Sequence, residues 1–187
     1  MTETIMPAFG RFKEQGIIIG CLLAGYGELE FELCRCVSAV TTDWDAAVRA
    51  MFKDRGELRR IQTAKALIGD AYINVGLARE YLHALADLDW CRQIRNQYAH
   101  CGWYDSSAEG VCIYDLETLA KDPTPIIFVT MKRFPVDLPL LQHQEEFFKY
   151  VQKCFWFLDC KYCTLAARPP NHQHSMPSVV ARPRKHN

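Results

Sequence analysis

Hydrophobic residues recur at helical spacing through the first hundred residues of the chain. The pattern predicts four helices, over about Phe9–Val40, Trp44–Phe52, Glu57–Ile73 and Leu77–Cys101. Thr42 and Asp43 are expected to cap the second helix, because their side-chain oxygens accept hydrogen bonds from the backbone amides at a helix start. Gly102 stands where a cap for the end of the fourth helix is expected.

The pattern changes after this fourth helix. A polar stretch over residues 105–110 predicts a loop, and short β-branched runs at Val111–Tyr114 and Ile126–Met131 predict the two strands of a hairpin. A last helix, rich in aromatic residues, is expected from about Leu138 to Ala166. The polar, proline-containing segment after it predicts a disordered tail. The fold class is therefore all-α or mainly α, with one small β-hairpin.

The first predicted helix is unusual because it is apolar on nearly every side between Ile17 and Leu23. A helix of this kind is buried on more than one face, which predicts packing against its own core and against a second subunit. A membrane span is excluded, since the most apolar run, Ile17–Tyr26, is about half of the length that a bilayer requires. Three acidic residues, Glu28, Glu30 and Glu32, follow it at once. A solvated face is expected for them, and a salt bridge from one of them to Arg95 is the alternative.

Composition and charge limit the choice of partners. Hydrophobic residues make up 49% of the 187 residues, as in a soluble globular protein, and 22 basic residues balance 22 acidic ones. A role with RNA must therefore rest on a local basic surface. Residues 49–65 hold six basic and two acidic residues, and Arg55, Arg59 and Arg60 are the candidate RNA-binding residues among them. The alternative is a solvated helix face.

Nine cysteines and the lack of a recognisable signal peptide predict a reducing, cytoplasmic setting. Cys160 and Cys163 form a C-x-x-C pair, but it lies inside a predicted helix with no second pair at zinc-finger spacing. His172 and His174 follow in the tail. We expect neither a metal site nor a cofactor.

Candidate chemistry is concentrated in Arg95-Asn96-Gln97-Tyr98-Ala99-His100, which closes the fourth predicted helix. Histidine exchanges protons near neutral pH, and arginine offers a permanent charge and a fork of donors suited to phosphate. RNA cleavage needs little more, because the ribose 2′-hydroxyl is itself the nucleophile. On a straight helix, however, Arg95 and His100 lie about 140° apart. Either the last turn unwinds, or two subunits pair their motifs in one cleft.

The segment from Ile94 to Trp103 resembles the HEPN family, many members of which carry an Arg-Asn-x-x-x-His motif at the end of a helix. The resemblance implies an antiparallel bundle of four to five helices, usually dimeric, with both motifs at the subunit interface. It implies a single HEPN-like domain over residues 1–166, with the β-hairpin at about 110–132 as an insertion before the last helix. Residues 167–187 would be a disordered basic tail.

Many members of this family are metal-independent endoribonucleases, often toxins or anti-phage defence proteins. On that pattern Arg95 would hold the scissile phosphate, His100 would act as general acid or base, and Asn96 would orient them. RNA, a second copy of the chain and an antitoxin are the implied partners. Toxins with a nucleotidyltransferase antitoxin carry a tyrosine two residues after the histidine, where this chain has Gly102. That form of regulation is therefore doubtful.

Some members of the family have lost catalysis. The alternative to a ribonuclease is therefore a non-catalytic helical dimer, an interaction module or a nucleotide-binding HEPN-like protein. In that case Arg95, Asn96 and His100 would form a polar network at an interface. An exposed Arg95 and His100 in a shared basic cleft would favour the nuclease, and burial with saturating salt bridges would favour the module.

Overall fold

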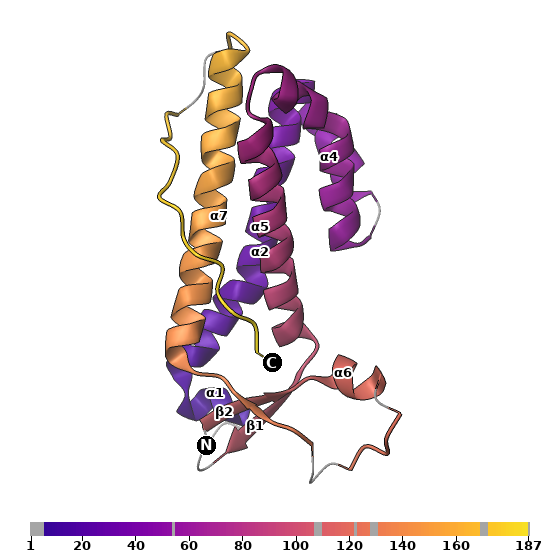
Figure 1. The fold of residues 1–187 in the computed structure, drawn as a ribbon, viewed down its shortest axis with the longest axis vertical. Coiled ribbons are helices and arrows are strands. Elements are labelled where there is room, and N and C mark those ends of the chain that lie inside the picture. Colours follow the sequence, from indigo (N-terminus) through magenta and orange to yellow (C-terminus); the bar gives the residue numbers. More distant parts are fainter. Residues whose placement is uncertain are drawn as a thin grey trace. The chain divides into compact units, whose positions relative to one another are not determined.

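The computed structural model of the protein describes residues 6–53, 55–106, 110–121, 123–127, 131–168 and 172–186 (Figure 1). Helices account for 69% of the described residues, which also include a small antiparallel sheet of three strands, so the expectation of a mainly α protein is confirmed. The chain forms two compact units. The first comprises Met1–Ala24, Gln93–Glu146 and Pro183–Asn187, and the second comprises Gly25–Arg92 and Phe147–Arg182.

Helix positions follow the hydrophobic periodicity closely. The helices at the predicted positions are α1 (Pro7–Arg11) with α2 (Lys13–Thr41), α3 (Trp44–Phe52), α4 (Glu57–Asn74), α5 (Ala78–Ala99) and α7 (Leu138–Leu165). Phe12 separates α1 from α2, because its φ of −109° and ψ of 63° are not helical. Asp43 caps α3 as expected, and its Oδ1 accepts a hydrogen bond from the Ala46 amide at 2.9 Å. Three helices, α2, α5 and α7, contribute residues to both units.

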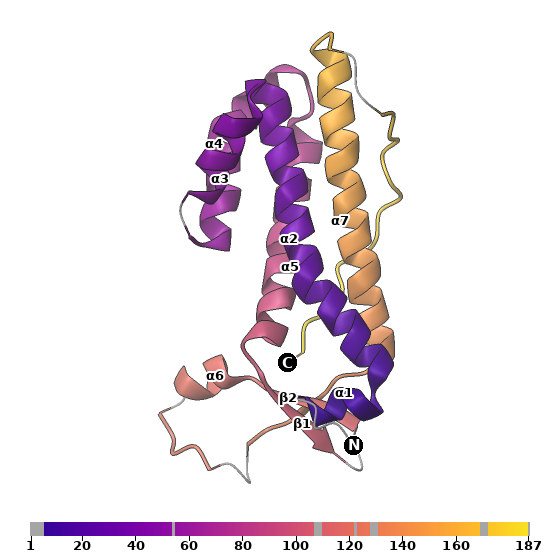
Figure 2. The ribbon, with the colours of Figure 1, turned by 180° about the vertical axis from the view of Figure 1, so that it is seen from behind.

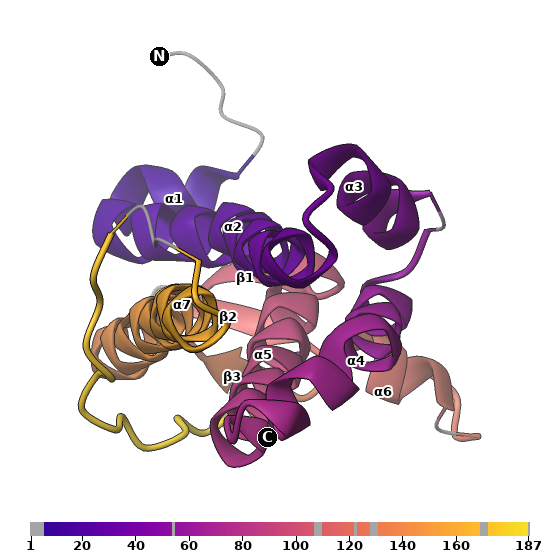
Figure 3. The ribbon, with the colours of Figure 1, turned by 90° about the horizontal axis from the view of Figure 1, so that it is seen from above.

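The second unit contains helices and no strand among its described residues, and α3 and α4 lie side by side in it (Figure 3). Tyr72 of α4 lies at its centre. The Tyr72 ring stacks on Tyr81 of α5 at 4.5 Å and lies 5.1 Å from Tyr162 of α7. An ion pair of 3.0 Å joins Arg35 of α2 to Asp159 of α7. These contacts tie four helices together around one aromatic core.

The first unit contains the sheet, which has the order β1 (Gly102–Ser106), β2 (Gly110–Tyr114) and β3 (Phe134–Pro135). Both pairings are antiparallel, with Gly102 opposite Tyr114 and Ile113 opposite Phe134. The strand predicted at Val111–Tyr114 is therefore present, but its main partner is the segment directly after α5.

The strand predicted at Ile126–Met131 is wrong at its described residues. Ile126, Ile127 and Met131 lie in no strand, Ile126 and Ile127 are more than half exposed, and residues 128–130 lie outside the described residues. Leu116–Lys121 instead form a short helix, α6. Periodicity did not identify β1, because its sequence Gly-Trp-Tyr-Asp-Ser lacks β-branched residues.

Helix α1 packs on the sheet within the first unit (Figure 2). The Phe9 ring meets Trp103 of β1 edge to face at 5.0 Å, and Arg11 pairs with Asp105 at 3.0 Å. Gly102 is not the helix cap that we expected, since its φ is not positive. A Cβ atom at this position would come within 3.2 Å of the Tyr114 ring, so Gly102 allows that ring to lie against the backbone.

The first half of α2 is covered on one face only. Ile18 and Ile19 are buried, whereas Ile17 is 66% exposed and Cys21 is also exposed. The expected burial on both faces is therefore not met within one chain. None of the described helices is long and apolar enough to cross a membrane.

Candidate active site

The motif lies in the first unit, at the end of α5 and the start of the chain segment that leads to β1. Helix α5 ends at Ala99, but the amide of His100 still donates to the carbonyl of Asn96 at 3.1 Å. The last turn therefore keeps its helical hydrogen bond through His100. Unwinding of this turn, the first of the two ways in which Arg95 and His100 could converge, is not observed.

The three motif side chains differ in their surroundings. Nη1 of Arg95 donates to Oδ1 of Asn96 at 3.0 Å, and both side chains are half-buried. His100 is exposed beyond the end of the helix. Asn96 and His100 lie four residues apart, on one face of the helix, whereas Arg95 projects about 140° away from His100. The structure thus places Asn96 beside Arg95 and leaves the His100 imidazole open to a ligand.

Tyr98 occupies one of the x positions of the Arg-Asn-x-x-x-His motif, and it is buried and hydrogen-bonded. It is 2% exposed, and its hydroxyl donates to Oε1 of Gln144 at 2.5 Å. The same hydroxyl lies 2.9 Å from Nε2 of His186, and its ring lies 6.0 Å from Trp103 in a stacked arrangement. Gln144 is completely buried in α7. Burial raises the pKa of Tyr98 far above its ordinary value, so the phenol stays protonated at neutral pH.

The hydrogen-bond pattern fixes the proton on His186. Tyr98 has one hydroxyl proton and donates it to Gln144, so its oxygen is the acceptor for Nε2–H of His186. Burial lowers the pKa of His186 to about 4, a shift that Asp137 opposes and Arg184 reinforces. His186 is therefore neutral near pH 7 and is a hydrogen-bond donor, whereas His100 is the exposed histidine of this region.

Residues Pro183–His186 form what we call the C-terminal strap, an extended segment that lies on the first unit's part of α5 and α7 (Figure 1). The Gln97 side chain makes two hydrogen bonds with the backbone of His186, at 2.7 Å to its carbonyl and 3.1 Å from its amide. Gln144 donates to the carbonyl of Arg184 at 3.0 Å. We expected disorder over residues 167–187, and the residues of the strap instead make these defined contacts.

Basic residues of the tail have partners in the protein. Within the first unit, Arg184 pairs with Asp137 at 3.0 Å, and Nζ of Lys185 donates to Gln93 at 2.9 Å. Within the second unit, Arg182 pairs with Asp87 at 2.7 Å. Arg182 and Arg184 are exposed, so these contacts are surface ion pairs.

The candidate RNA-binding residues lie in the second unit, at the start of α4 or just before it, and the motif lies in the first unit. Arg60 pairs with the buried Glu30 at 2.5 Å and lies 4.9 Å from the Phe52 ring. Glu30 and Glu32 are buried, which makes the expectation of a solvated acidic face wrong for these two residues. Arg55 and Arg59 are exposed and are better placed than Arg60 to meet a phosphate.

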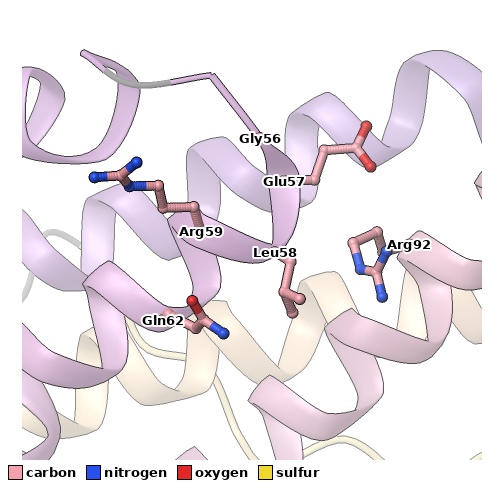
Figure 4. A pocket seen from close by; sticks show the side chains of 6 residues that line it. All are labelled: Gly56, Glu57, Leu58, Arg59, Gln62 and Arg92. Carbon is pink, nitrogen blue, oxygen red and sulfur yellow. The ribbon is translucent and has the colours of Figure 1, made fainter.

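A surface pocket of about 600 Å³ lies beside these residues in the second unit. Its lining residues are Gly56, Glu57, Leu58, Arg59, Gln62 and Arg92 (Figure 4). Figure 4 shows the guanidinium groups of Arg59 and Arg92 on opposite sides of Leu58. The two cations therefore do not converge on one anion.

The cysteines are all free thiols, and six of the nine are buried. Burial raises the pKa of Cys101, next to the motif, to about 12, so this thiol is not a nucleophile at neutral pH. Among the residues that the structure describes, no group of three or more histidine, cysteine or acidic side chains is arranged to hold a metal ion.

Sequence reasoning missed Gln97, Gln144 and His186. Gln144 had a detectable signal, since it follows Leu140 and Leu141 at helical spacing and precedes Phe147 and Phe148. A glutamine at such a core position must find hydrogen-bond partners. His186 had no comparable signal, because it stands in a polar segment without periodicity.

Comparison with known proteins adds no relative. No protein-family model matches the chain, and no curated protein or solved structure matches it significantly. The resemblance to the HEPN family thus rests on the motif.

Proposed function

We propose that this protein is a metal-independent endoribonuclease of the HEPN type, with Arg95, Asn96 and His100 as its active-site residues. The observation that supports this most is the exposed His100 imidazole at the end of α5, on the same helix face as Asn96, which accepts a hydrogen bond from Arg95. A proton-transfer group is thereby open to a ligand, and the Arg95 guanidinium of the same helix end is oriented by Asn96.

The reaction is an internal transesterification. His100 takes the proton of a ribose 2′-hydroxyl, whose oxygen attacks the adjacent phosphorus and forms a new P–O bond. The bond from phosphorus to the 5′ oxygen breaks, and that oxygen receives the proton from His100. The products are a 2′,3′-cyclic phosphate and a 5′-hydroxyl end. Arg95 stabilises the additional negative charge on the phosphorane, and Asn96 orients the Arg95 guanidinium.

A second copy of the chain would complete the site. Arg95 and His100 of one α5 project in different directions, so one motif does not enclose a phosphate. Pairing of two chains would let Arg95 of one copy face His100 of the other. The uncovered side of α2 in the first unit, with Ile17 and Cys21, offers apolar surface for such a pairing.

Cleavage of a 5′-labelled single-stranded RNA in the presence of excess EDTA tests the proposal. We expect fragments with 2′,3′-cyclic phosphate ends from the wild type, and loss of cleavage in Arg95→Ala and in His100→Ala. His83→Ala is the matched control, since His83 is an exposed histidine of the same helix. Circular dichroism shows whether each variant is folded. Cleavage that persists in both motif variants, or stops in EDTA, would contradict the assignment.

One observation favours a second candidate, a non-catalytic interaction module. Arg95 is half-buried, and part of its hydrogen-bonding capacity is used within the chain, by Asn96. In a module, Arg95→Ala and His100→Ala would change the oligomeric state measured by analytical ultracentrifugation. No form of the protein, wild type included, would cleave RNA.

A further inference from the structure

The strap lies on the helix face that carries part of the motif. Gln93 and Gln97, which bind the strap, are four residues apart on α5, within its last two turns. At 100° per residue, His100 lies about 20° from Gln93 and about 60° from Gln97 around the helix axis. The strap therefore runs beside the face from which His100 projects.

Buried polar groups anchor the strap to the first unit. Gln144, which is completely buried, accepts from Tyr98 and donates to the Arg184 carbonyl, so one side chain joins the motif to the strap backbone. Pro183 is buried as well. Removal of the strap would deprive the Gln144 amide of the Arg184 carbonyl and the Tyr98 hydroxyl of the His186 imidazole, although Tyr98 and Gln144 would keep the hydrogen bond between them. A buried amide that loses its acceptor is costly. A segment anchored in this way acts as a fixed part of its unit and not as a lid that opens readily.

Two further contacts act directly on the last turn of α5. The Gln97 amide makes paired hydrogen bonds with the His186 backbone, as a neighbouring strand would, and the His186 imidazole donates to Tyr98. Tyr98 lies two residues before His100 and is fixed on its other side by Gln144. The turn between Asn96 and His100 is thus held from the strap and from α7.

We propose that the C-terminal strap holds the motif turn in place, with Tyr98, Gln144 and His186 as positioning residues for Asn96 and His100. None of the three touches the reacting atoms. The expected effect on kcat rests on the proposed ribonuclease function. The expected loss of order in the turn between Asn96 and His100 does not rest on it. Displacement of a catalytic group by about 1 Å can lower a rate on the order of a hundredfold, so loss of this anchor is expected to lower kcat.

The test compares His186→Leu, which removes the donor to Tyr98, with His186→Gln, whose side-chain amide can restore a donor. His172→Leu is the matched control, because His172 is an exposed histidine of the same C-terminal segment. Amide hydrogen exchange over residues 97–101 reports on the motif turn, and kcat and KM for RNA report on catalysis. Circular dichroism and the melting temperature identify a variant that has failed to fold, and Gln97→Ala then replaces it as the change that releases the strap backbone.

In His186→Leu we expect amide exchange over residues 97–101 to accelerate about tenfold, because the turn loses one of its anchors. We expect kcat to fall about tenfold, and KM to change less than twofold because the residues that bind RNA are not altered. His186→Gln should recover most of both losses, and His172→Leu should change neither. Unchanged exchange would overturn the proposal, and an increase in kcat would show that the strap is an inhibitory lid. If the wild type cleaves no RNA, the ribonuclease proposal fails, and the exchange measurement alone decides whether the strap holds the turn.

Discussion

The buried imidazole of His186 makes docking of the strap dependent on pH. In the docked state burial lowers the pKa of His186 from 6.5 to about 4, with Asp137 opposing the shift and Arg184 reinforcing it. A strap released into water would regain the ordinary histidine pKa. Protonation is therefore favoured in the released state, and docking weakens as the pH falls from about 6.5 to about 4. Well above pH 6.5 the docking free energy is at its full value.

The size of the effect follows from the two pKa values. The loss of docking free energy relative to pH 8 is about 1 kcal/mol at pH 6, about 2 kcal/mol at pH 5 and about 3 kcal/mol at pH 4. Below pH 4 the loss approaches its limit, because both states are then protonated. A loss of about 2 kcal/mol lowers a docking equilibrium constant roughly thirtyfold.

Two measurements test this dependence. The titration of each histidine, followed by the NMR shift of its Hε1 proton, should show one residue with a pKa near 4, and that signal should be missing in His186→Gln. The free energy of urea unfolding, measured from pH 7.5 to pH 4, should fall more steeply in the wild type than in His186→Gln. The difference between the two proteins removes the contribution of the carboxyl groups. A His186 signal that titrates near 6.5, or parallel pH profiles, would refute the reasoning.

Three further outcomes are expected. Arg60→Met leaves the carboxylate of Glu30, which is 4% exposed, without its cation and should lower the free energy of urea unfolding by about 3 kcal/mol. Tyr98→Phe removes the donor to buried Gln144 and should lower the free energy of unfolding by about 1–3 kcal/mol. Iodoacetamide at pH 8 should leave Cys36 unmodified in the folded protein, as read by peptide mass spectrometry, because Cys36 is buried and burial strongly raises the pKa of its thiol.

Each of the two substitutions has a control. Glu28→Gln alters an exposed acid two residues before Glu30 and should change the free energy of unfolding by less than about 0.5 kcal/mol. Tyr104→Phe is the control for Tyr98, since Tyr104 lies in β1 and is only partly buried. Equal losses in test and control variants, or early labelling of Cys36, would show that the burial described here does not govern these residues.

Helix positions could be predicted from the sequence because apolar residues recur at helical spacing along each long helix. On α5 the apolar residues Tyr81, Leu88, Cys91 and Ile94, which recur at helical spacing, are buried. On α4 the same spacing does not mark burial as closely, since Leu58 and Leu67 are nearly half exposed although Ile61 and Ile68 are buried. Periodicity marks the apolar side of a helix, and only tertiary packing decides how wide the buried stripe is.

The sheet and the strap could not be predicted by the same means. Strand β1 pairs with β2 through backbone groups of Gly102–Ser106, a sequence without strand periodicity. The contacts of His186 join residues almost ninety positions apart in the chain, through amide and imidazole groups that have no hydropathy pattern. The motif itself could be located because its residue types are chemically distinctive, but whether Arg95 and His100 act on one phosphate depends on how two chains associate.

Mixing two inactive variants tests the paired site most directly. Arg95→Ala and His100→Ala, each purified and each unable to cleave RNA alone, are combined after mild dissociation and reassociation. In a mixed dimer one site keeps Arg95 from one chain and His100 from the other, so random pairing should restore about a quarter of the wild-type rate. Recovery of cleavage with 2′,3′-cyclic phosphate ends would support RNA cleavage across two copies of the chain. No recovery from a mixture that ultracentrifugation shows to be dimeric would contradict it.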